Sequence, residues 1–130
     1  MIARVKNIRT VDSLNIIEFD FSSITLKMMS LELNKDIVIG KKVELLVKPT
    51  SVIISKNFIE DISLSNQILA KIVEINSGEL LSNIILKIEN SYLESIITKD
   101  SCLKLNLQKD YIVNILIKAS DLSILRVFND

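Results

Sequence analysis

Two tripeptides of the sequence carry the same pair of chemical groups, a lysine ammonium and a hydroxyl two residues later. They are Lys118-Ala119-Ser120 and Lys48-Pro49-Thr50, and each closes an apolar run. Where a strand ends, a lysine can project its charge while the following turn exposes backbone N–H groups beside the hydroxyl. Such donors can hold a tetrahedral oxyanion without a strong overall charge. The spacing fits this interpretation, and it also fits a lysine that is merely solvated.

The composition excludes most other chemistry that a protein site could carry. The chain has no histidine, so it lacks the commonest general base and metal ligand. Its two glycines cannot form a phosphate-binding loop or a dinucleotide fingerprint. The acidic residues alternate with apolar residues or lie in a polar stretch, as solvated surface groups do; examples are Glu18, Asp20, Glu60 and Asp61. We therefore expect a protein that is not an enzyme and that binds no metal atom directly through its side chains.

The two tripeptides occupy corresponding places in two related copies of one sequence unit. Adding 67 to the residue number pairs Ala3 with Ala70, Ile8 with Ile75, Leu14 with Leu81 and Ile17 with Ile84. Adding 70 pairs Val43 with Val113, Leu46 with Leu116, Lys48 with Lys118 and Thr50 with Ser120. A repeat of this length indicates two equivalent units rather than one enzyme core.

The repeat divides most of the chain into three parts. We predict a first, degenerate unit at residues 1–56, a connection at residues 57–62 and a second unit at residues 63–127. Units of about 60 residues lie near the lower size limit for independent folding, so the two should depend on each other. The polar stretch at 56–67, which contains the connection, lacks the low complexity of a flexible linker. Its serines and asparagines either have a functional role or belong to a plain polar linker, and composition favours neither interpretation.

Each copy is predicted to form about five short strands, which makes the fold class all-β. Apolar and polar residues alternate at 17–21 and again at 84–88, as in strands with one buried face. Other strand candidates are residues 1–9, 24–31, 42–48 and 51–55 in the first copy and 68–76, 92–98, 111–118 and 121–127 in the second. Only the second copy predicts a short helix, which begins after Thr98, where a capping hydroxyl precedes Leu103 and Leu107.

Net charge, cysteine content and the length of apolar runs indicate which partners and which cellular compartment to expect. Sixteen basic and sixteen acidic residues cancel, so net charge would not attract a nucleic acid. The single cysteine, Cys102, excludes an intrachain disulfide and fits a reducing cytosol as a small buried residue. No signal-peptide core and no apolar run of membrane-spanning length is visible. We expect a cytoplasmic protein that contacts neither nucleic acid nor membrane directly.

Four pieces of the second copy follow one another in a recognisable order. They read Ser63-Leu-Ser-Asn-Gln-Ile-Leu-Ala-Lys-Ile-Val-Glu-Ile, Ile84-Ile-Leu-Lys-Ile, Ile96-Ile-Thr-Lys-Asp-Ser with Leu105-Asn-Leu, and Ile115-Leu-Ile-Lys-Ala-Ser-Asp-Leu-Ser-Ile-Leu. Together they resemble a Mop-type TOBE domain, the module of the molybdenum-pterin-binding protein family. The first copy resembles it more faintly, through Met1-Ile-Ala-Arg-Val-Lys-Asn-Ile and Val47-Lys-Pro-Thr-Ser-Val-Ile-Ile. The chain as a whole is similar to the tandem, or di-Mop, members of that family.

The resemblance implies an OB-like five-stranded β-barrel for each copy, with strands shared between the copies. It also implies a homo-oligomer, a dimer or a trimer, that holds molybdate or tungstate at its interfaces. The family's contacts to the oxyanion come from the arm before the first strand, from the opening of the short helix in a neighbouring unit and from a strand end. The matching positions here are Ser63, Leu64, Ser65, Thr98, Ser101, Lys118, Ala119 and Ser120.

This chain departs from the family pattern at two places. Ser65 stands where the family has an arginine, which removes one cationic contact. The first copy is expected to lack both the arm and the short helix. Lys48 and Thr50 still match the family's strand end, and Ser30 would correspond to Thr98 in a second site. For the first copy we favour a structural role over such a site.

Two functions follow as hypotheses. The first is a cytoplasmic binding protein that takes up molybdate or tungstate for storage, homeostasis or sensing. In it, Lys118 supplies charge while hydroxyl and N–H groups bond the oxygens of the anion. The alternative is a structural assembly or interaction module whose ligand site has decayed and whose partner is a transporter subunit or a regulator. Binding of single-stranded nucleic acid is a weaker third option, because it needs basic grooves and aromatic platforms.

Overall fold

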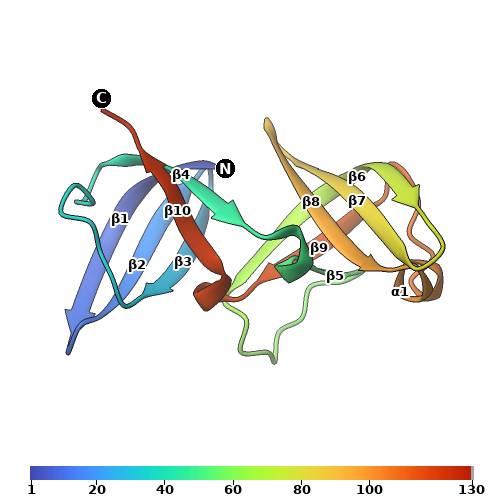
Figure 1. Cartoon of the computed structure of the whole chain (residues 1–130), viewed down its shortest axis with the longest axis horizontal. Helices are drawn as coiled ribbons and strands as arrows, with labels where there is room; N and C mark the ends of the chain where they lie inside the picture. Colours follow the sequence, from blue (N-terminus) through green and yellow to red (C-terminus); the bar gives the residue numbers. More distant parts are fainter. Residues whose placement is uncertain (130) are drawn as a thin grey trace. The chain divides into compact units, whose positions relative to one another are not determined.

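The fold is built mainly from β-strands, which form two curled five-stranded sheets (Figure 1). The computed structural model describes residues 1–129. The first sheet has the strand order β10-β4-β1-β2-β3, with β1 (Ile2–Val11), β2 (Leu14–Phe21), β3 (Ile24–Ser30), β4 (Lys42–Val47) and β10 (Leu122–Val127). The second has the order β5-β9-β6-β7-β8, with β5 (Ile53–Ser55), β6 (Asn66–Ser77), β7 (Leu81–Ile88), β8 (Ser91–Thr98) and β9 (Ile112–Ile117). The predicted all-β class with two OB-like units is confirmed.

The last strand of each copy belongs to the sheet of the other copy. Strand β5 pairs with β9, where Ile54 lies opposite Ile115, and β10 pairs with β4, where Ser123 lies opposite Leu46. Both pairings are antiparallel. Each sheet therefore contains four strands of one copy and one of the other, as the family resemblance implied.

The core follows from alternating side chains, and the two copies alternate in the same way. Strands β2 and β7 have identical burial patterns, with every second residue buried. Ile17 and Phe19 of β2, like Ile84 and Leu86 of β7, are fully enclosed. Burying one such side chain stabilises the fold by about 1.5–3 kcal/mol, so these strands are major contributors to each core. The alternation predicted for both strands is confirmed.

A β-bulge recurs at the same place in the two copies. The pairing of β1 with β2 shifts between Val5 and Asn7, and that of β6 with β7 shifts between Ile72 and Glu74. Adding 67 to the first pair of residue numbers gives the second. A bulge inserts an extra residue and increases the local twist of its strand. The repeat is therefore visible in the backbone as well as in the sequence.

The copies differ after their third strand. In the second copy, β8 leads into helix α1 (Lys99–Lys104), which confirms the short helix predicted there. Cys102 of this helix is buried, as predicted, and so is Leu107 beyond it. In the first copy, β3 leads into an irregular segment at 31–41, in which the described backbone forms turns and no helix. Ile37 is the only buried residue of that segment, as Cys102 is the only buried residue of α1.

Two single-turn 3-10 helices follow the long runs that end in lysine, and neither was predicted. Helix η1 (Pro49–Ser51) lies between β4 and β5, and η2 (Ala119–Asp121) lies between β9 and β10. Proline in the first turn of η1 suits a position whose backbone needs no N–H partner.

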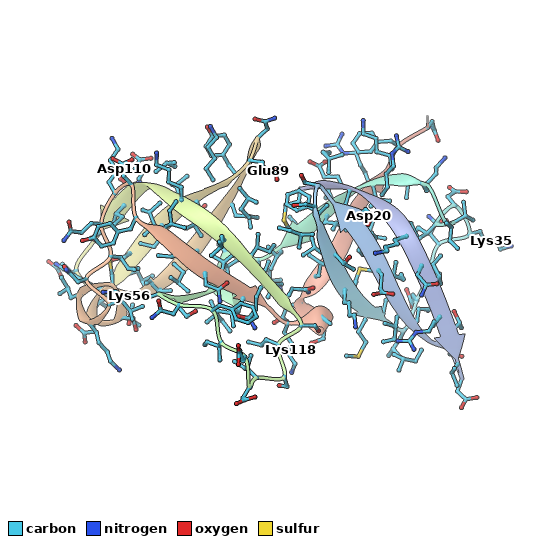
Figure 2. All side chains as sticks on the ribbon, turned by 180° about the vertical axis from the view of Figure 1, so that it is seen from behind. Asp20, Lys35, Lys56, Glu89, Asp110 and Lys118 are labelled. Atoms are coloured by element: carbon cyan, nitrogen blue, oxygen red, sulfur yellow. The ribbon has the colours of Figure 1, made fainter. Side chains whose placement is uncertain are left out.

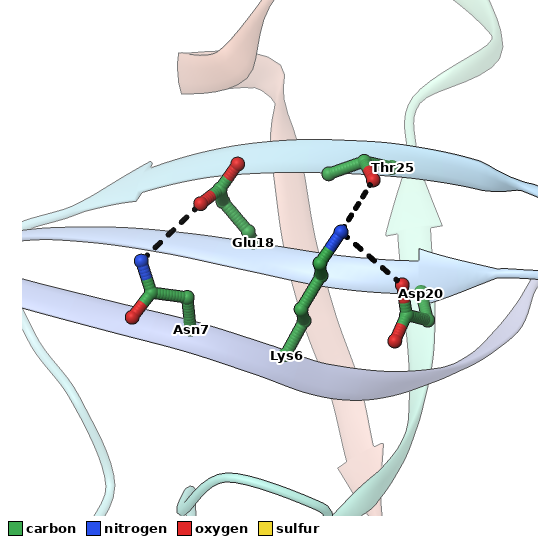
Figure 3. A network of polar contacts seen from close by, with 5 residues as sticks. All are labelled: Lys6, Asn7, Glu18, Asp20 and Thr25. Atoms are coloured by element: carbon green, nitrogen blue, oxygen red, sulfur yellow. Dashed lines mark hydrogen bonds and ion pairs between the residues drawn. The ribbon is translucent and has the colours of Figure 1, made fainter.

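Polar side chains cross the outer face of the first sheet (Figure 3). Lys6 of β1 donates to Thr25 of β3 over 3.2 Å, and its Nζ lies 3.7 Å from Asp20 Oδ1 of β2. Asn7 donates to Glu18 Oε1 over 3.3 Å. Such exposed contacts across strands add little energy each, but they help to fix which residues lie opposite one another.

The chain forms two compact units whose membership crosses the sequence repeat. The first contains residues 1–47, Leu64–Asn66 and the chain from Lys118 onward, and the second contains Lys48–Ser63 and Gln67–Ile117. The boundaries of the two copies at 1–56 and 63–127 concern relatedness in sequence, and they stay a prediction.

Candidate functional site

The Lys118-Ala119-Ser120 segment forms a turn rich in unused hydrogen-bond donors. Lys118 is extended (φ −67°, ψ 140°) and its carbonyl accepts from the Asp121 N–H over 2.9 Å, which starts η2. Lys118, labelled in Figure 2, and Ser120 are exposed. Within residues 1–129, the N–H groups of Ala119 and Ser120 and the Ser120 hydroxyl bond to no other residue. One ammonium, two N–H groups and one hydroxyl are therefore available to an anion.

The Lys48-Pro49-Thr50 segment repeats this turn with one donor fewer. Lys48 has almost the same backbone (φ −66°, ψ 136°), and its carbonyl accepts from the Ser51 N–H over 2.8 Å. Lys48 and Thr50 are exposed like their counterparts. Proline has no N–H, so only Thr50 can present a backbone donor beside the hydroxyl. The first turn has the geometry of the second but a weaker set of contacts for an anion.

Each turn packs against the third strand of a sheet. In the first unit, η2 contacts β3. Ser120 lines a groove of about 860 Å³ with mixed polar and apolar walls, together with Ser30, the last residue of β3. The Ser30 hydroxyl already exchanges hydrogen bonds with the backbone of Glu32, accepting from its N–H over 3.2 Å. Ser30 is thus near Ser120, but its hydroxyl is occupied in a local turn.

In the second unit, η1 contacts β8, and a buried hydroxyl fixes the chain just beyond it. Ser95 of β8 donates to the Val52 carbonyl over 2.7 Å. Thr98 ends the same strand and caps α1 by accepting from the Ser101 N–H over 3.1 Å. The Thr98 hydroxyl also donates to Ser101 Oγ over 2.9 Å. The proton of the Ser101 hydroxyl is then left for a ligand, since that oxygen accepts from Thr98.

The arm Ser63-Leu64-Ser65 presents further unused donors just before β6. Ser63 and Ser65 are exposed and Leu64 is half-buried. In the described part of the chain, no hydrogen bond joins any of the three to another residue. Their N–H groups and two hydroxyls are therefore free to contact a ligand.

The structure distributes the predicted site residues between the two compact units. Leu64, Ser65, Lys118, Ala119, Ser120 and Ser30 lie in the first unit, and Ser63, Thr98, Ser101, Lys48 and Thr50 lie in the second. The exchange of β5 and β10 explains this division, because each turn enters the unit that receives its following strand.

The carboxylates are arranged as surface groups rather than as a cation cage. Asp20, Glu60 and Asp61 are exposed as predicted, and the half-buried Glu18 is engaged by Asn7 (Figure 3). Over residues 1–129, no group of three or more acidic, cysteine or histidine residues is placed to hold a metal ion. None of the helices described here has both the length and the apolar character needed to cross a membrane.

Sequence reasoning missed two features of this site. The first is the consequence of Pro49: the proline is visible in the sequence, but that its missing N–H leaves the first turn one donor short follows only once the turn is known to repeat. The second is the pairing of Asn66, which is 1% exposed, with the backbone of β3. Its position beside the arm was a signal, but nothing in the sequence indicated its partner.

Comparison with known proteins supports the fold through structure alone. No protein-family model matches the chain, and no curated protein sequence matches it. Among solved structures, the chain is similar to the cytoplasmic molybdate-binding protein ModG in its crystal form grown from PEG with molybdate bound. The TM-score is 0.87 at 19% sequence identity, over 95% of this chain and 92% of that one. The chain therefore shares the fold of a molybdate-binding protein along nearly its whole length.

Proposed function

We propose that this chain is a cytoplasmic oxyanion-binding protein that takes up molybdate or tungstate for storage, homeostasis or sensing. The observation that carries the proposal is the Lys118-Ala119-Ser120 turn, whose ammonium, N–H and hydroxyl donors are exposed and unused. The fold shared with ModG, which was solved with molybdate bound, supports the same class of ligand. A binding protein as structural relative also favours binding over catalysis.

In the proposed site, Lys118 supplies the charge and the N–H groups of Ala119 and Ser120 bond oxygens of the anion. The Ser120 hydroxyl and the arm Ser63-Leu64-Ser65 add donors that bear no charge. Hydrogen bonds to a charged acceptor are worth about 1.5–3 kcal/mol each, so several together can hold a dianion without a second cation. Because every contact is made to oxygen, selection rests on the size and charge of the anion.

The proposed assembly is a homo-oligomer, a dimer or a trimer, with the anion at its interfaces. Thr98 and Ser101 open helix α1 at an exposed position, and the Ser101 hydroxyl retains a free proton. A neighbouring subunit could present this pair to the turn at Lys118. We assign the first copy a structural role, since Pro49 removes a donor and the Ser30 hydroxyl is engaged.

Isothermal titration of the purified protein with molybdate and tungstate, with sulfate as control, tests the proposal. We expect micromolar or tighter binding of the first two and none of sulfate, with the mass of the oligomer measured alongside. Lys118→Ala should weaken binding, while Lys109→Ala, which removes another exposed lysine, should leave it unchanged. Equal binding by the Lys118→Ala variant and the parent would show that the site is assigned wrongly.

The alternative is an assembly module with a decayed site. Ser65, which supplies no positive charge where the family has arginine, is the observation that favours it. In that case, no heat would be released with any of the three anions. The protein would instead co-purify with a transporter subunit or a regulator.

A further inference from the structure

The side chain of Asn66 pairs with the backbone of β3 as a neighbouring strand would. Asn66 is the first residue of β6 and is 1% exposed. The Lys27 N–H donates to Asn66 Oδ1 over 2.7 Å, and Asn66 Nδ2 donates to the Lys27 carbonyl over 2.8 Å. Paired strands exchange two hydrogen bonds between opposite residues in the same manner. Asn66 thus acts as a one-residue strand on the edge of β3.

The next side chain, Gln67, makes a similar pair with Ile59, a residue that precedes the arm. Gln67 Oε1 accepts from the Ile59 N–H over 3.1 Å, and Gln67 Nε2 donates to the Ile59 carbonyl over 2.7 Å. Asn114, which is 1% exposed on β9, donates to the same Gln67 oxygen over 2.8 Å and so fixes the orientation of its amide. Residues 59–67 therefore form a loop that is closed by side-chain amides.

The arm Ser63-Leu64-Ser65 lies inside this closed loop and has no hydrogen bonds of its own among residues 1–129. Fixing the backbone of a residue costs conformational entropy, so a ligand that must itself order three residues binds less tightly. Hydrogen bonds that anchor both ends of a short segment already restrict its backbone during folding, before the ligand binds. Side-chain amides that bond backbone, one of them buried, next to donors that bond nothing, are the arrangement expected of a preorganised contact.

Strand β3 connects the arm with the turn at Lys118. Helix η2 packs against β3, and Leu64–Asn66 belongs to the same compact unit as η2 and β3. By pairing with Lys27, Asn66 holds Leu64 and Ser65 next to the strand on which the turn rests.

We propose that Asn66 is a positioning residue for the oxyanion site. Its pairing with β3 orders the N–H groups of Leu64 and Ser65 and the Ser65 hydroxyl before the anion arrives. This inference rests on the proposed function, because it concerns the same ligand. It goes beyond that function by assigning a role to a buried residue that does not touch the anion.

The first test compares Asn66→Ala with Asn15→Ala. Asn15 is also a buried amide of the first unit, and it donates to the Ser30 carbonyl over 3.2 Å away from the arm. Titration with molybdate should show at least tenfold weaker binding for Asn66→Ala. Asn15→Ala should bind within about twofold of the parent, although both variants lose thermal stability. Parent-like affinity in Asn66→Ala overturns the proposal.

A double-mutant cycle separates positioning from general loss of stability. Ser65→Ala should weaken molybdate binding in the parent but not further in the Asn66→Ala background, since Ser65 is no longer held there. Lys118→Ala should weaken binding in both backgrounds, because the turn does not depend on Asn66. An effect of Ser65→Ala that is equal in the two backgrounds contradicts the proposed role.

Backbone ¹⁵N relaxation without any anion supplies a readout that does not depend on binding. Ser63, Leu64 and Ser65 should be ordered in the parent and mobile in Asn66→Asp, which keeps the side-chain volume and can fold where alanine fails. Order parameters should fall from about 0.85 to below about 0.6. Unchanged mobility refutes the role of Asn66. A flat titration of the parent refutes the oxyanion function, so the two failures are distinguishable.

Discussion

The two lysine turns have the same shape but different chemistry. Lys48 and Lys118 have backbone angles that agree within a few degrees, and both turns continue as 3-10 helices. The difference is a single atom group, because Pro49 lacks the N–H that Ala119 offers. The comparison teaches that one backbone turn can present different numbers of hydrogen-bond donors, depending on the residue that follows the lysine.

The largest expected effect concerns the matched cores. Ile17→Ala and Ile84→Ala each remove a fully buried side chain from equivalent strands and should each cost about 2–5 kcal/mol of unfolding free energy. Because the burial patterns are identical, the two losses should be similar in urea denaturation. A loss confined to one variant would show that the copies do not contribute equally to stability.

The next prediction compares what the two lysine ammonium groups contribute to molybdate affinity. Lys118→Ala should weaken molybdate binding by about 1.5–3 kcal/mol, the value of a hydrogen bond to a charged partner. Lys48→Ala should change affinity by less than about twofold, because its turn has fewer donors. Titration at one ionic strength measures both, and a larger effect of Lys48→Ala would reverse our assignment of the site.

Substitutions at the ends of β3 and β8, the third strands of the two copies, should have a smaller effect on stability. Thr98→Ala removes the cap of α1 and should lower stability by about 1 kcal/mol. Ser30→Ala at the matching end of β3 should cost less, since it loses only a local turn without a helix. Thermal unfolding of the two variants gives the comparison, and equal losses would contradict a special role for the cap.

The smallest expected effect on stability comes from giving each turn the residue that the other has after its lysine. Ala119→Pro should leave the melting temperature nearly unchanged, because proline already occupies the equivalent place after an extended lysine. It should still weaken molybdate binding by about 1.5 kcal/mol, the lower end of the range for a hydrogen bond to a charged acceptor, because the N–H is lost. Pro49→Ala is the matched reverse change, and its effect on the number of bound anions reports whether the first turn can gain a site. Unaltered binding by Ala119→Pro would exclude that N–H from the contacts.

The fold could be predicted further than the site. Alternation at 17–21 and 84–88 specified strands and their buried faces, because local sequence determines this pattern. The partners of β5 and β10 could not be derived from the residues, since pairing such as Ile54 with Ile115 depends on distant contacts. For that exchange, the prediction came from family resemblance.

In the candidate site, too, contacts between residues distant in sequence could not be derived from the sequence. The donors at Lys118 could be identified from residue types and spacing, because a lysine and a hydroxyl at a strand end have predictable chemistry. The pairing of Asn66 with β3 could not be predicted, since an asparagine in a polar segment usually marks a turn. Its role depends on the edge of β3, which lies 39 residues earlier in the chain.

The exchange of the last strands also determines whether one copy can fold without the other. Neither copy is a detachable module, because a fragment ending near residue 56 would carry β5 without β9 and would leave β4 without β10. Each half would expose an unpaired strand edge, a common starting point for aggregation. The tandem therefore folds as one piece: a turn can lack a backbone donor, as Pro49 shows, but neither copy can be deleted without leaving a strand of the other unpaired.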